Sequence, residues 1–152
     1  MSTHSVSALL NRLIETCRDG EEGFRTAAGA VHNPDLKTLF RSLSLQRHEF
    51  IDELQAIVRD LREAPETNGS VAGVLHRGWI RLKAVVCSGD EAAILAECEC
   101  GEESAVAEYR DVMESGELPA EIGNVLRLHL MGVGGALQQI HEVRGHFKSM
   151  VG

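Results

Sequence analysis

The segment A-V-H-N-P-D-L, residues 30–36, joins two long helical patterns with almost no break between them. Before it, apolar residues recur every three or four positions, which predicts a helix over residues 5–31. After it, the same spacing predicts a helix over residues 34–62. Asn33 is a favourable N-cap, and Pro34 suits the first helical position because it has no N–H to leave unbonded. A connection this short makes the two helices antiparallel neighbours.

The second half of the chain repeats this layout after a strong break. The break is A-P-E-T-N-G-S, residues 64–70, which is rich in turn formers. A short apolar helix is predicted over residues 71–86, and a longer one over residues 91–114. The sequence S-G-E-L-P, residues 115–119, predicts a tight turn, and the last helix is predicted over residues 119–150.

These elements predict an all-α fold. Two antiparallel hairpins joined by a long crossover are typical of the ferritin-like four-helix bundle, and here the crossover carries a short extra helix. The chain has 152 residues, of which 43% are hydrophobic, so it is long enough to bury a core of its own. We therefore expect residues 1–152 to form a single domain.

Charge and composition narrow the classes of partner and the cellular location. The net charge of −8 repels phosphate backbones, so nucleic acid is not expected as a partner. No apolar run reaches the ~20 residues that span a bilayer, and no basic helix face suggests a membrane surface. The first residues lack a cationic segment followed by an apolar one, so a cytoplasmic location is expected. The four cysteines fit no disulfide framework there and are expected to be free thiols.

A weak internal repeat relates the two hairpins. The motif C-x-x-G-E-E at residues 17–22 returns at residues 98–103, an offset of 81. An offset of 83 aligns Gln46 with His129 in the second helix of each hairpin. The change of two residues falls in the hairpin turns, where it is tolerated.

Counting ~1.5 Å per residue from the two hairpin turns places four polar residues at one level of the bundle. The predicted polar layer contains Glu21, Gln46, Glu102 and His129, with Arg47 nearby. In one interpretation, Glu21, Glu102 and His129 bind a metal ion such as Fe, Mn or Zn. In the other, the layer is hydrogen-bonded and sets helix register, with Arg47, His129 or a proton compensating the buried carboxylates.

The standard di-iron motif is absent from the sequence. Di-iron bundles take a Glu from each of two helices and a Glu-x-x-His from each of the other two. None of the seven His residues has a Glu three positions before it. A two-iron oxidase is therefore not expected, and the case for an enzyme is weak.

Two cysteines are expected beside the polar layer. Cys17 and Cys98 would face each other one turn away from it, and Gly20 and Gly101 would let their helices approach closely. A thiol-based redox role for this pair is a third hypothesis. It requires the two Cα atoms to lie within ~7 Å.

Three segments resemble a bacterial family of ferritin-like domains of unknown function. They are L-I-E-T-C-R-D-G-E-E-G-F, S-V-A-G-V-L-H-R-G-W and E-C-G-E-E, and the resemblance extends over roughly residues 6–148. It implies a four-helix fold and kinship with rubrerythrin-type proteins. It implies no particular activity.

The leading hypothesis is a non-catalytic bundle that acts through assembly or stress-related binding. An exposed apolar surface would make it a homodimer, and the Trp79 segment is one candidate for that surface. The alternative is a metal-binding protein that uses Glu21, Glu102 and His129.

Overall fold

The computed structural model describes residues 2–66 and 78–151, and every regular element within these ranges is an α-helix. Four helices are long and one is a short turn of helix: α1 (Thr3–Ala30), α2 (Pro34–Asp60), α3 (Leu82–Val86), α4 (Glu91–Glu114) and α5 (Ala120–Val151). The all-helical prediction is confirmed, and the bounds of the long helices differ from the predicted ones by at most two residues.

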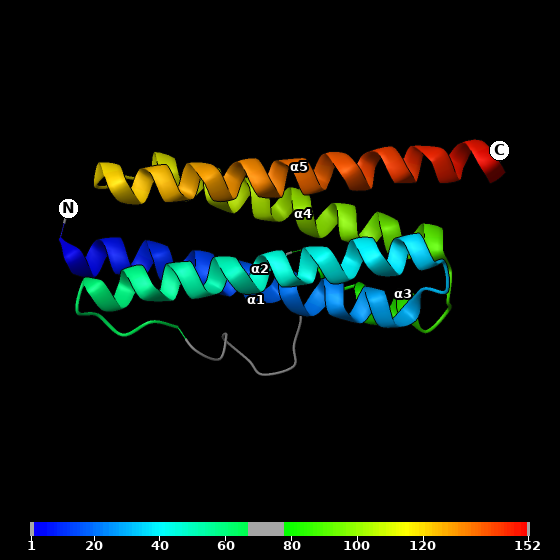
Figure 1. The fold of residues 1–152 in the computed structure, drawn as a ribbon, viewed down its shortest axis with the longest axis horizontal. Helices are drawn as coiled ribbons and strands as arrows, with labels where there is room; N and C mark the ends of the chain where they lie inside the picture. The colour runs from blue at the N-terminus through cyan, green and yellow to red at the C-terminus, as the bar shows by residue number, and fades with distance from the viewer. Residues whose placement is uncertain (1, 67–77, 152) are drawn as a thin grey trace.

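The helices form two antiparallel pairs that lie against each other. Figure 1 shows α1 beside α2 and α4 beside α5, with the N- and C-termini at opposite ends of the bundle. Helices α2 and α4 begin at the same end of the bundle and α2 ends at the other, so the end of α2 and the start of α4 lie at opposite ends. The arrangement agrees with two hairpins joined by a crossover.

The turn between α1 and α2 is held by side-chain caps. The Asn33 side chain accepts hydrogen bonds from the N–H groups of Asp35 and Leu36, at 2.9 and 3.2 Å. The Glu91 carboxylate, in the first turn of α4, accepts from the N–H groups of His32 and Asn33, at 2.6 and 2.9 Å. Because Glu91 caps a turn from another hairpin, it also fixes where α4 begins relative to α2.

The predicted crossover helix over residues 71–86 is confirmed only over its last residues, Leu82–Val86. Residues 71–77 lie outside the described residues, and helix α3 begins only at Leu82. Gly78 has a φ of +89°, which a helix does not allow and which favours glycine. Here the chain turns inward to place Trp79 in the core rather than continuing as a helix.

Trp79 is buried between α1 and α4, so it does not belong to an exposed apolar patch. Its indole lies against Gly23 and Gly101, where an added Cβ would come within 2.3 and 2.1 Å of the ring. The Phe24 ring meets it edge-on at a centroid distance of 4.9 Å. Gly101 therefore makes room for an indole, and the expected close approach of two helix backbones is not its role.

The core consists of two apolar clusters. One contains Leu13, Cys17, Leu54, Tyr109 and Leu126, and the other contains Phe24, Phe40, Trp79, Cys98 and Ile140, each with further neighbours. The first cluster draws on the early part of α1 and the late part of α2, and the second on the opposite parts. A polar layer falls between them.

We predict that two glycine substitutions in α1 have opposite effects. Gly23→Ala should lower the free energy of unfolding by about 1–3 kcal/mol, because the new methyl group overlaps the rigid Trp79 ring. Gly29→Ala should raise it by about 0.5–1 kcal/mol, because alanine is the better helix former and nothing lies within 4 Å of the new atom. Urea denaturation followed by circular dichroism measures both. Equal effects of the two substitutions would contradict the packing of Trp79 on Gly23.

Candidate functional site

An ion pair between α2 and α4 forms the centre of the polar layer. Arg47 is 1% exposed and Glu102 is 0% exposed. The guanidinium donates two hydrogen bonds to the carboxylate, from Nη1 to Oε1 at 2.5 Å and from Nη2 to Oε2. Such a bidentate pair compensates both charges and fixes their relative orientation.

The surroundings of Arg47 fit its size and charge. Its guanidinium carbon lies 5.5 Å from the centre of the Phe24 ring. A Cβ at Gly20 would lie 3.0 Å from Nη1, so Gly20 makes room for Arg47. Burial alone lowers the pKa of Arg47, but the Glu102 carboxylate more than offsets this and raises the pKa above its ordinary value. Arg47 therefore stays charged in the core.

Glu21 does not join Glu102. Its carboxylate lies at the seam between α1 and α2, where Oε2 is 2.6 Å from Nδ1 of His48 and 3.7 Å from Nη2 of Arg25. The sequence repeat suggested equal roles for the two glutamates. They differ because the single arginine of the layer pairs with the carboxylate from α4, whereas Glu21 contacts Arg25 and His48 at the seam.

His129 belongs to a different polar group. The imidazole is buried, with Nδ1 2.9 Å from the Tyr109 hydroxyl and Nε2 3.2 Å from Oε2 of Glu53. Its ring stacks on Phe50 at a centroid distance of 3.9 Å. The Tyr109 hydroxyl also lies 3.2 Å from Sγ of Cys17. A hydrogen-bonded chain thus connects the half-exposed Glu53 carboxylate to a buried thiol.

Burial keeps the inner members of this chain neutral. It raises the pKa of Cys17 to about 11 and raises the pKa of Tyr109 well above its usual range. It also lowers the pKa of His129, although hydrogen bonding to Glu53 acts in the opposite direction. At neutral pH the chain therefore connects a thiol, a phenol and a neutral imidazole.

Tyr109, Glu53 and Phe50 were not among the residues predicted from the sequence. A usable signal did exist for Tyr109, because it lies on the apolar stripe of its helix and a buried phenol needs a hydrogen-bond partner. No signal distinguished Glu53 from the other acidic residues of α2. Only the packing of α5 on α2 brings its carboxylate to His129.

The remaining predicted residues lie around the layer. The Gln46 amide donates to the Gly132 carbonyl at 3.5 Å, at the seam of α2 with α5. Cys17 and Cys98 are both buried and free, but they belong to different apolar clusters. Burial also raises the pKa of Cys98 well above its usual range, which disfavours the reactive thiolate. A redox role for the two cysteines stays a prediction.

The three predicted metal ligands make separate contacts. Glu102 is bonded to Arg47, Glu21 to His48, and His129 to Tyr109 and Glu53. Across residues 2–66 and 78–151, no group of three or more His, Cys, Asp or Glu side chains is placed to hold a metal ion. Metal binding by Glu21, Glu102 and His129 stays a prediction, and it requires the Arg47–Glu102 pair to open.

We predict that removing one partner of the buried pair destabilises the protein more than replacing both partners with apolar residues. Glu102→Ala should lower the free energy of unfolding by about 3–5 kcal/mol, because it leaves the Arg47 charge buried without a counter-ion. The double variant Arg47→Met/Glu102→Leu should cost much less than the sum of the single variants, because no charge is left unpaired. Chemical denaturation of Glu102→Ala, of the single variants Arg47→Met and Glu102→Leu, and of the double variant measures these differences.

A control for this test is Glu22→Ala, which removes the exposed pair with Arg25 and should change stability by less than about 1 kcal/mol. Strict additivity of the Arg47 and Glu102 substitutions would contradict direct coupling between the two residues.

His129 should make stability depend on pH. Its pKa is lowered in the folded protein, so below pH ~6.5 the unfolded chain binds a proton that the folded chain excludes. Stability should therefore fall as the pH is lowered from about 7 towards the pKa of the folded state. His129→Gln should remove this part of the decline, whereas His32→Gln, at an exposed position, should leave it intact. Denaturation at a series of pH values tests this, and parallel curves for the wild type and His129→Gln would contradict it.

The fold and the site define a class: a helical bundle of two hairpins with a buried ion pair at the centre of its polar layer. A family model described as "Domain of unknown function (DUF2383)" matches residues 5–115. The chain belongs to this family. The match extends from α1 to the end of α4, so α5 and His129 lie beyond it. No curated protein matches the chain.

None of the described helices combines the length and the apolar character needed to cross a bilayer.

Proposed function

We propose that this chain is a non-catalytic, ferritin-like bundle that functions by assembling with a second copy of itself through α5. The two hairpins joined by a long crossover support the ferritin-like assignment. The polar layer supports a structural role, because Arg47 and Glu102 neutralise each other and His129 has a partner on each ring nitrogen.

The observation that carries the proposal is the outer face of α5. Leu128 is 66% exposed and Met131 is 69% exposed, and with Gly135 they recur at a spacing that places them on one side of the helix. No Asp, Glu, Lys or Arg occurs between Arg127 and Glu142, although these residues make up 25% of the chain. Depletion of charge around exposed Leu and Met is typical of an interface core.

Two glycines, Gly135 on this side of α5 and Gly134 beside it, support helix-on-helix packing. An added Cβ at Gly134 or Gly135 would meet nothing within 4 Å, so neither glycine is required by packing within the described residues. Each costs about 1 kcal/mol of helix stability relative to alanine. A second helix lying across α5 would fill the space left by the absent side chains, with Leu128 of one copy packing over Gly135 of the other. A twofold axis makes the contact self-complementary, as in most homodimers.

We predict that the wild-type protein is a dimer and that substitutions on this face make it monomeric. Leu128→Glu should weaken dimerisation at least tenfold, because it places a carboxylate in a dehydrated contact. Gly135→Leu should do the same by steric exclusion, while the folded monomer accommodates the new side chain in open space. Sedimentation equilibrium gives the mass and the dissociation constant.

Two matched controls separate the interface from general surface effects. Leu45→Glu changes a leucine that is 60% exposed on α2, and Gly29→Leu fills open space on α1. Both should remain dimeric. A monomeric wild type at micromolar concentration, or equal weakening by the controls, would overturn the proposal.

A further inference from the structure

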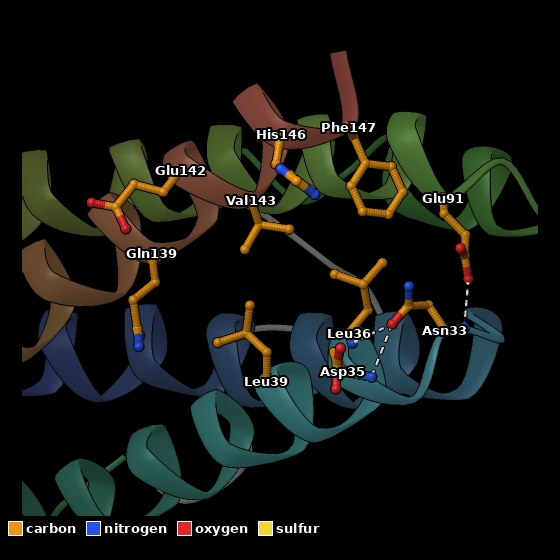
Figure 2. Close-up of a pocket in the computed structure, with 10 residues that line it drawn as sticks. All are labelled: Asn33, Asp35, Leu36, Leu39, Glu91, Gln139, Glu142, Val143, His146 and Phe147. Atoms are coloured by element: carbon orange, nitrogen blue, oxygen red, sulfur yellow. Dashed lines mark hydrogen bonds between the residues drawn. The ribbon is translucent and has the colours of Figure 1, made fainter. Parts of the chain in front are cut away.

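A groove of about 790 Å³ opens between α2 and α5 at the end of the bundle that holds the turn between α1 and α2. The two helices touch near their middle, where Phe50 stacks on His129 and Gln46 bonds to Gly132. Beyond this contact the side chains of the two helices leave a gap between them, and Figure 2 shows the groove with the side chains that line it.

The floor of the groove is apolar. Leu36 and Leu39 point into it from α2, and Val143 and Phe147 point into it from α5 (Figure 2). Leu36 belongs to the second apolar cluster, and the other three are partly buried against it. The floor is thus a part of the core that the two helices leave uncovered, and it favours an apolar body.

The rim of the groove is acidic. Asp35, Glu91 and Glu142 contribute three carboxylates, and no Lys or Arg is among the described side chains that line it. The Glu91 carboxylate already caps the turn between α1 and α2, whereas Asp35 and Glu142 line the groove from α2 and α5. The nearby cation Lys37 is directed away, because its ammonium group donates to the Ala28 carbonyl on α1. The potential at the mouth therefore attracts cations.

We propose that this groove binds an organic cation with an apolar body, of the size of a small drug-like molecule. Its volume lies in the range of sites for such ligands. An aromatic ring and carboxylates that line the same groove are the combination that recognises substituted ammonium and similar ions, through the face of the ring and through charge. The proposal is independent of assembly through α5, whose interface residues Leu128, Met131 and Gly135 do not line the groove.

Tetraphenylphosphonium and tetraphenylborate provide the test, because they match in size and shape and carry opposite charges. Amide NMR titration of the full chain should show tetraphenylphosphonium binding with shifts centred on Leu39, Val143 and Phe147. Tetraphenylborate should bind at least tenfold more weakly, because its charge is repelled at the rim. Equal affinity for the two ions, or shifts centred elsewhere, would overturn the proposal.

Two sets of substitutions separate the contribution of the aromatic ring from that of the rim carboxylates. Phe147→Ala should weaken binding of tetraphenylphosphonium about tenfold, through the lost ring contact. Asp35→Asn/Glu142→Gln should weaken it about three- to tenfold and reduce the difference between the two ions. Glu114→Gln/Glu117→Gln makes the same change in net charge at the turn between α4 and α5, and should leave both affinities unchanged.

Two further results would also overturn the proposal. If the rim variant and its control weaken binding equally, the effect comes from net charge and the site is not in this groove. If Phe147→Ala alters the mass of the protein in solution and leaves the affinity for tetraphenylphosphonium unchanged, a second chain covers the groove and the proposal is wrong.

Discussion

The buried pair of Arg47 and Glu102 is the constraint on which the middle of the bundle depends. Burying either charge without the other is costly, so α2 and α4 must pack in the axial register in which the Arg47 guanidinium meets the Glu102 carboxylate. Arg47 also dictates Gly20 on α1, since a larger residue would occupy the space of the guanidinium. One ion pair thereby links three of the four long helices and divides the core into its two apolar clusters.

The glycines divide into two groups with different physical explanations. Gly20, Gly23 and Gly101 each lie against a large side chain from another element, so their cost in helix stability is offset within the chain. Gly134 and Gly135 lie against nothing that the described residues provide, and the same is true of Gly29 on α1. Open space at a helical glycine therefore does not by itself indicate a partner, and the proposed contact through α5 rests on the exposed Leu128 and Met131 in the same stretch and on its lack of charged residues.

The seam between α2 and α5 combines two environments along its length. In the middle, Phe50, Glu53 and His129 close it with stacking and hydrogen bonds. Towards the C-terminus of α5 the side chains no longer meet, and the edge of the core is open beneath a rim of carboxylates. The same pair of helices thus supplies both a closed structural contact and a surface that is available to a ligand.

Sequence alone determined the four long helices, because apolar spacing and the caps at Asn33 and Pro34 are local properties that a neighbouring helix cannot easily override. It also placed Glu102 and His129 in a polar layer on or beside the apolar stripes, and both are buried. It assigned the stripe of α2 to Gln46 with Arg47 nearby, whereas Arg47 is the buried residue of the two. The partners of these residues were decided by tertiary structure. Glu21 and Glu102 occupy equivalent places in a repeated motif, yet one lies at a seam and the other in the core, because the layer contains a single arginine. Trp79 was placed by Gly78, Gly23 and Gly101 acting together from three segments, and no local pattern encodes such a pocket.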